Sequence, residues 1–138
     1  MKKLMFLFIT FIFVSSVFGQ NVQIPDKNTK LLIYYFHVTH RCNTCIKIEN
    51  TTKKILDTYY SKELKKGIII FQSINCELPE NKNLVDKYQA YGATLAFTPI
   101  IQGKEAGIDD QTSFAFSKIN NEEVFTEGLK EKINSYIK

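Results

Sequence analysis

The chain has no large excess of charge of one sign. It contains 18 lysine and arginine residues against 14 aspartate and glutamate residues. Because Lys2 and Lys3 lie in the first 19 residues, residues 20–138 carry 16 basic and 14 acidic side chains, a net charge of +2. The basic residues are scattered, whereas a nucleic-acid-binding surface needs a clustered basic stripe. The composition therefore argues against a nucleic-acid partner.

Glycine is sparse as well. The six glycines form no G-x-G-x-x-G pattern, the fingerprint with which many proteins hold the pyrophosphate of a flavin or nicotinamide cofactor. The sequence also lacks internal repeats and low-complexity segments. We therefore expect no cofactor.

Only one long hydrophobic run is present, and it follows the basic start MKK. Val17 and Gly19 are small residues at positions −3 and −1 of a cut before Gln20, so residues 1–19 have the layout of a secretory signal peptide. The apolar stretch 4–18 is shorter than the ~20 residues that span a bilayer, which argues against an uncleaved anchor. We expect an exported protein, periplasmic or extracellular, with no membrane segment after cleavage.

Cysteine is scarce too. The three cysteines are Cys42, Cys45 and Cys76. A polar lead-in at 20–29 precedes a single domain at 30–138, and a chain of about 120 residues can bury an adequate core without disulfides. Export would place the thiols in an oxidising compartment, where a pair can rest as a disulfide.

The hydrophobic pattern alternates between strand and helix signals. Near-continuous apolar runs predict buried strands, and apolar residues spaced by three and four predict amphipathic helices. A hairpin turn is expected at QGKE, and the segment 106–119 fits either an edge strand or a capped helical turn. The expected strands are 31–38, 68–74 and 94–101, and the expected helices are 45–64, 79–92 and 121–138. This order predicts an α/β fold with a partly parallel sheet.

Cys42 and Cys45 lie where the first strand gives way to the first helix. A helix amino terminus carries free N–H groups and partial positive charge, which lowers the pKa of a thiol placed there. Arg41 adds a neighbouring positive charge. We expect Cys42 to be exposed and to attack a disulfide, and the more shielded Cys45 to resolve the mixed disulfide.

A Cys-x-x-Cys between a strand and a helix, followed by KYQAYG and a further strand, resembles the thioredoxin fold. The resemblance covers about residues 30–137 and implies a minimal βαβ-ββα core with a central mixed sheet and flanking helices, without the extra amino-terminal strand and helix of thioredoxin. More narrowly, YYFH…RCNTCIKIE followed by SINCELPENKNLVDKYQAY resembles an exported thioredoxin-like family often labelled as an ArsF-type nitroreductase subunit. The thioredoxin resemblance implies protein thiols or disulfides as partners.

Three departures from the thioredoxin pattern matter. Arg41 stands where the tryptophan of W-C-x-x-C would be, and Phe36 occupies the place of a buried aspartate. Thr94 aligns with the cis-proline that faces the cysteines in thioredoxins. Since a cis bond before a non-proline residue costs ~2.5–4 kcal/mol, we expect a trans loop there. Pro99 is then expected inside a strand, at a bulge or a non-hydrogen-bonded position.

Three interpretations of the cysteine pair stay open. The first is a thiol–disulfide oxidoreductase, in which Cys42 and Cys45 are catalytic and Arg41 and Thr94 support them. The second is a copper or zinc site, because His37 and His40 precede the pair and thiolate with imidazole suits these metals; a packed or solvated role for each histidine is the simpler interpretation. The third is an interaction subunit with a structural disulfide.

Two further residues have competing interpretations. Cys76 is expected to be a small buried apolar residue, with a role as a partner thiol as the alternative. Glu49, one turn after Cys45, is expected to be a solvated carboxylate, with proton acceptance as the alternative. The oligomeric state stays open.

Overall fold

The computed structural model describes residues 24–138. Its strands are β1 Leu31–His37, β2 Ile69–Asn75, β3 Thr94–Ile101, β4 Lys104–Glu105 and β5 Asp109–Asp110, and its helices are α1 Asn43–Tyr59, α2 Ser61–Lys65, α3 Lys82–Tyr88, α4 Thr112–Lys118 and α5 Glu122–Ile137, with a 3-10 turn at Pro79–Asn81. The predicted signal peptide lies outside the described residues. None of the helices in this part of the chain has both the length and the apolar character needed to cross a membrane.

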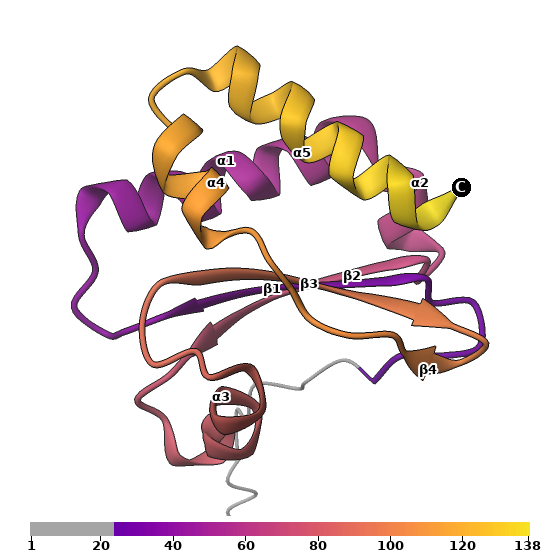
Figure 1. The fold of residues 1–138 in the computed structure, drawn as a ribbon, viewed down its shortest axis with the longest axis horizontal. Helices are drawn as coiled ribbons and strands as arrows, with labels where there is room; N and C mark the ends of the chain where they lie inside the picture. The colour runs from indigo at the N-terminus through magenta and orange to yellow at the C-terminus, as the bar shows by residue number, and fades with distance from the viewer. Residues whose placement is uncertain (1–23) are drawn as a thin grey trace, which may run out of the picture.

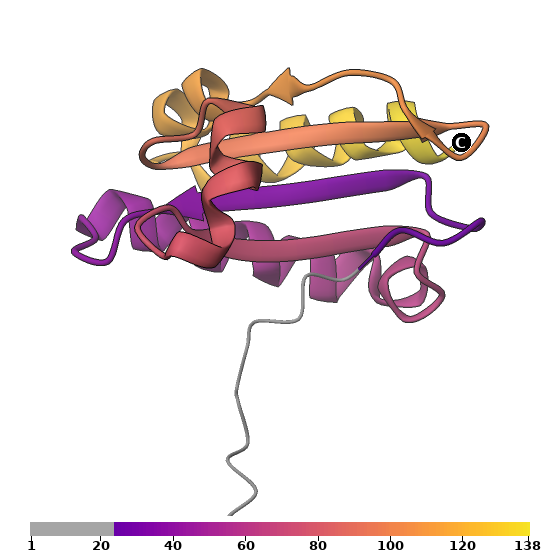
Figure 2. The ribbon, with the colours of Figure 1, turned by 90° about the horizontal axis from the view of Figure 1, so that it is seen from below.

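The strands form one mixed sheet in the order β2-β1-β3-β4, with β5 also paired to β3. β1 and β2 are parallel, and β3 is antiparallel to β1. Helices α1, α2, α4 and α5 cover one face, and α3 crosses the other (Figures 1 and 2). The predicted βαβ-ββα core with a central mixed sheet is confirmed.

β1 is buried on both faces, as its unbroken apolar run predicts. Successive strand side chains point to opposite faces, so Leu31, Ile33 and Tyr35 join the core beneath α1 and α5. Leu32, Tyr34 and Phe36 join a second core beneath α3. The central strand therefore holds two helical layers together.

The first helix differs from the prediction at both ends. It begins at Asn43, because Cys42 is its N-cap residue. It is interrupted at Tyr60, whose backbone leaves helical geometry and whose hydroxyl donates to the Lys130 carbonyl (3.2 Å) and to Asn134 Oδ1 (3.1 Å) on α5. This buried tyrosine anchors α1 to α5 and separates the short α2, so the predicted single helix 45–64 is wrong.

The predicted helix 79–92 is too long. Its first turn is the 3-10 turn, and α3 ends when Gln89 adopts a left-handed conformation with φ of 51°. The following Ala90 N–H donates to the Val85 carbonyl (3.0 Å) and the Ala90 side chain is buried. The helix therefore stops short of Gly92, because the chain turns inward at Ala90.

The ambiguous segment 106–119 contains the two residues of β5 and the helix α4, so SFAFS is helical rather than an edge strand. The final helix begins as predicted, with the Val124 N–H donating to Asn121 Oδ1 (3.2 Å) at its N-cap. Phe125, Leu129 and Ile133 are buried against the sheet side of the molecule, whereas Val124 is 43% exposed.

Asp109 links β5 to the end of α5. Burial opposes its ionisation, but hydrogen bonds from Tyr136 Oη (2.6 Å), Lys132 Nζ (2.9 Å) and Gln111 Nε2 (2.7 Å) outweigh burial and lower the pKa of the Asp109 carboxyl. A carboxyl with a lowered folded-state pKa stabilises the fold above its unfolded pKa of about 3.9, and this contribution is lost as the pH falls through the folded value.

We therefore expect Asp109→Asn to lower the free energy of unfolding by a constant amount from pH 8 to pH 5. The difference from the wild type should shrink below about pH 4, where the aspartate becomes protonated. Urea unfolding at stepped pH measures this. Asp57→Asn, an exposed position on α1, is the control, and an Asp109→Asn deficit that persists undiminished to pH 2 would contradict the prediction.

Candidate functional site

Cys42 and Cys45 form a disulfide where α1 begins, beyond the carboxyl end of β1. Their Cα atoms are 5.2 Å apart, within the usual range for a disulfide. Cys42 is the N-cap residue of α1, and the Cys45 N–H donates to its Sγ at 3.1 Å. Cys42 is exposed and Cys45 is half-buried, as the sequence predicts. The helix amino terminus thus presents an N–H group to the sulfur that solvent reaches.

The loop that carries Cys42 is tied to the end of β2. The Thr39 N–H donates to Glu77 Oε2 (2.8 Å), and Asn75 Nδ2 donates to Thr39 Oγ1 (3.0 Å). The hydrogen bonds from Thr39 lower the pKa of the Glu77 carboxyl. Two neighbouring strands therefore position the approach to the cysteine pair.

Arg41 is engaged by other side chains. Its Nη2 forms an ion pair with Glu49 Oε2 on α1, and only 18% of the arginine side chain and 16% of the glutamate side chain are exposed. The expectation that Glu49 is a solvated carboxylate is therefore wrong. The predicted positive charge of Arg41 beside Cys42 is therefore paired with the negative charge of Glu49.

Tyr35 is a residue of this site that the sequence analysis did not single out; it lies within the predicted strand 31–38. Its hydroxyl donates to the Cys45 carbonyl at 2.8 Å, and the Arg41 guanidinium lies 5.6 Å from the centre of its ring. Burial raises the pKa of the Tyr35 hydroxyl, and the neighbouring Arg41 partly counters this. The sequence feature that could have indicated this role is a tyrosine on the α1 side of β1, because a buried tyrosine hydroxyl usually has a hydrogen-bond partner.

The register of β3 places Thr94 and Pro99 at opposite ends of the sheet. Thr94 pairs with Phe36 near the carboxyl end of β1, whereas Pro99 pairs with Leu31 at the opposite end. Thr94 therefore lies at the end of the sheet from which the chain continues to the cysteines. The peptide bonds within 24–138 are all trans, as predicted for this loop.

Pro99 occupies the predicted non-hydrogen-bonded position. On the side of β3 that faces β1, the hydrogen bond is made by the next residue, Ile100, whose N–H donates to the Lys30 carbonyl (2.8 Å). The Pro99 carbonyl accepts a hydrogen bond from the Ala106 N–H (2.9 Å). The pairing of Pro99 with Leu31 continues the ladder in register. The missing proline N–H thus leaves the pairing with β1 unbroken.

Phe36, at the position of the thioredoxin aspartate, is fully buried on the α3 side. Its ring lies 5.2 Å from that of Tyr88 and 6.0 Å from that of Tyr34. The position is therefore part of an aromatic cluster.

The described residues offer no metal centre. Within 24–138, no three histidine, cysteine, aspartate or glutamate side chains come together in a way that could hold a metal ion. His37, at the end of β1, donates through Nδ1 to the Val38 carbonyl (2.9 Å), and His40 is exposed. The structure does not assemble the predicted histidine–cysteine set.

Cys76 follows β2 and is half-buried. Its thiol donates to the Ala90 carbonyl at 2.9 Å, and burial raises the pKa of the thiol despite opposing backbone hydrogen bonds. A raised pKa disfavours the reactive thiolate. These surroundings favour the packed apolar role.

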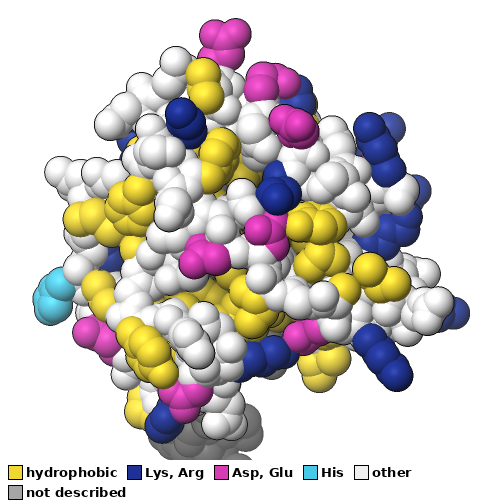
Figure 3. Space-filling model, viewed as in Figure 1, with side chains coloured by type: hydrophobic (Ala, Val, Ile, Leu, Met, Phe, Trp, Pro, Cys, Tyr) yellow, Lys and Arg dark blue, Asp and Glu magenta, His cyan; other side chains and the backbone are white. Residues whose placement is uncertain are grey.

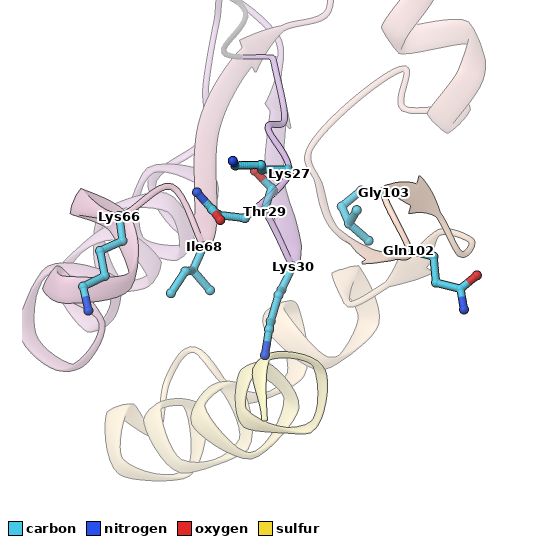
Figure 4. Close-up of a pocket in the computed structure, with 9 residues that line it drawn as sticks. Lys27, Thr29, Lys30, Lys66, Ile68, Gln102 and Gly103 are labelled. Carbon is cyan, nitrogen blue, oxygen red and sulfur yellow. The ribbon is translucent and has the colours of Figure 1, made fainter.

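A cavity of about 700 Å³ lies at the opposite end of the sheet, where β1 and β2 begin. Lys27, Lys30 and Lys66 line it, but their amino groups lie apart from one another (Figure 4). Lys30 Nζ donates to the Ile137 carbonyl (2.8 Å). The lysines therefore do not converge on a common anion site. On the face seen in Figure 3, charges of both signs are interspersed with separate hydrophobic patches.

The sheet order, the strand directions, the helix layers and a disulfide-bonded Cys-x-x-Cys at the start of α1 define a thioredoxin-like fold. Among solved structures, the chain is similar to Fasciola hepatica thioredoxin, with 19% identity, a TM-score of 0.42, and coverage of 69% of this chain and 84% of that one. It is also similar to a structure described as a malarial protein, with 14% identity, a TM-score of 0.40, and coverage of 65% and 96%. No family model matches the chain, and no curated protein matches it.

Proposed function

We propose that this protein is a thiol–disulfide oxidoreductase that exchanges disulfides with protein thiols through Cys42 and Cys45. The observation that carries the proposal is the position of Cys42: it is exposed, caps α1, and receives the Cys45 N–H. A thiolate at a helix amino terminus is stabilised, so Cys42 suits both attack and departure in thiol–disulfide exchange.

The exchange begins from the disulfide form. A thiolate of the client attacks Cys42 Sγ, the bond between the two sulfurs breaks, and Cys45 leaves as a thiolate. A second client thiolate then attacks the client sulfur of the mixed disulfide, and Cys42 leaves as a thiolate stabilised by the helix terminus. The client loses two electrons and this protein gains them. The reverse sequence reduces a client disulfide, with Cys45 as the resolving thiol.

Export belongs to the same proposal. The layout of residues 1–19 supports cleavage before Gln20, and an oxidising compartment supports a resting disulfide. The ArsF-type resemblance stays a prediction and rests on the two stretches YYFH…RCNTCIKIE and SINCELPENKNLVDKYQAY. The same thioredoxin-like site makes protein thiols and disulfides the expected partners.

A redox titration tests the function. The protein used begins at Gln20 and carries Cys76→Ser, so it contains every element of the described fold. It is equilibrated in graded glutathione buffers and alkylated, and the number of free thiols is counted by mass spectrometry. We expect a two-electron transition between roughly −120 and −270 mV, the range of working thioredoxin-type pairs. A pair that stays oxidised below about −300 mV would mark a structural disulfide and overturn the proposal.

A further inference from the structure

The Arg41–Glu49 pair differs from the surface ion pairs of this protein. Its side chains are 18% and 16% exposed, whereas those of Lys54 and Glu122 are 69% and 60% exposed. Exposed pairs are strongly screened by water and salt, while partly buried charges act on their surroundings over longer distances. The ion pair next to the cysteines can therefore influence a neighbouring ionisable sulfur.

The location of the pair connects it to both cysteines. Arg41 directly precedes Cys42, and Glu49 lies on α1 at positions i+7 from Cys42 and i+4 from Cys45. Residues at these spacings share one helix face, and helical side chains lean toward the amino terminus. The Glu49 carboxylate thus reaches back along the cysteine face to Arg41.

Tyr35, on β1, contacts both the Arg41–Glu49 ion pair and the start of α1. The Arg41 guanidinium lies over its ring, and its hydroxyl holds the Cys45 carbonyl. Of the other titratable groups near the loop 38–42, His40 is exposed, and Glu77, which follows β2, accepts a hydrogen bond from the Thr39 N–H. Arg41, Glu49 and Tyr35 therefore form one unit between β1 and the start of α1.

We propose that Glu49 is a positioning residue that holds Arg41 over Tyr35 and cancels the positive charge that Arg41 would otherwise present to the Cys42 sulfur. This inference rests on the proposed redox function of the pair. An unopposed arginine beside Cys42 stabilises its thiolate, and an unopposed glutamate destabilises it. Together they leave the helix terminus as the dominant influence on that sulfur.

The test measures the pH dependence of Cys42 alkylation by iodoacetamide. The reduced chain from Gln20 with Cys76→Ser is used, and the Cys42 peptide is followed by mass. At a pH below the Cys42 pKa, we expect Glu49→Gln to raise the rate by about threefold and Arg41→Gln to lower it by about threefold. A neighbouring charge changes the thiolate fraction by about tenfold at the lower end of its effect, and the opposite change in the nucleophilicity of the thiolate reduces this to about threefold in rate. The double substitution should restore the original rate, and Arg41→Lys, which keeps the charge, should stay close to it.

Rate changes of opposite direction in the two single variants, and an unchanged rate in the double variant, distinguish charge compensation from a structural role. If both single substitutions move the rate in the same direction, or neither moves it, the inference is overturned. The exposed pair gives the matched control, because Lys54→Gln and Glu122→Gln should leave the profile unchanged. Alkylation needs only a free thiol, so a chain that fails to exchange with glutathione still gives this result, and the failure of either proposal is recognised separately.

Discussion

Replacing Cys42 with serine is expected to abolish disulfide exchange, whereas Cys45→Ser should stop the reaction at the mixed disulfide. Cys42 is the exposed sulfur at the helix terminus, so its loss removes both the nucleophile and the leaving group. Without Cys45 no internal thiolate can resolve the adduct. Incubation of the reduced variants with glutathione disulfide, followed by intact mass, should show a lasting adduct on Cys45→Ser and none on Cys42→Ser.

Cys76→Ser is the control for this prediction. Its thiol is half-buried, bonded to the Ala90 carbonyl and shifted toward the protonated form, so the exchange rate should stay close to that of the wild type. Persistent exchange by Cys42→Ser, lost only when Cys76 is also replaced, would assign the nucleophile to Cys76 and contradict the mechanism.

Replacing Phe36 with alanine is expected to destabilise the fold by about 3–5 kcal/mol, the usual cost of emptying a buried phenylalanine site. Phe36 is fully buried and packs against Tyr34 and Tyr88, whose rings are held by the sheet and by α3. This is a large part of the 5–15 kcal/mol that stabilises a typical domain. Urea unfolding at neutral pH gives the difference in free energy.

Phe116→Ala is the matched control, because Phe116 lies on α4 and is 40% exposed. It should change the free energy of unfolding by no more than about 0.5 kcal/mol, as is usual at surface positions. Equal effects of the two substitutions would show that the α3-side core contributes less than its burial indicates.

Local sequence patterns predicted the elements whose formation depends on neighbours in the chain. The strand Thr94–Ile101 has the predicted bounds, and α5 begins within one residue of the predicted start. The exposed Cys42 and shielded Cys45 also followed from their places at the start of a helix. In each case the period of the apolar residues, or the position at the start of a helix, is a local property.

Long-range contacts decided the elements that were predicted wrongly. The hydroxyl of Tyr60 binds α5, about seventy residues later in the chain, and this anchor accompanies the break between α1 and α2. Ala90 is buried against the sheet, and the chain leaves α3 at Gln89 to bring it there. Neither partner is visible in the spacing of nearby residues.

The sequence by itself determined the α/β order, the central buried strand and the placement of two cysteines at a strand–helix junction, because each depends on hydrophobic period and short-range spacing. Only the tertiary structure joined Arg41, Glu49 and Tyr35 into one unit. This arrangement depends on side chains that meet across different elements. The charge around Cys42 is therefore a property of the folded chain.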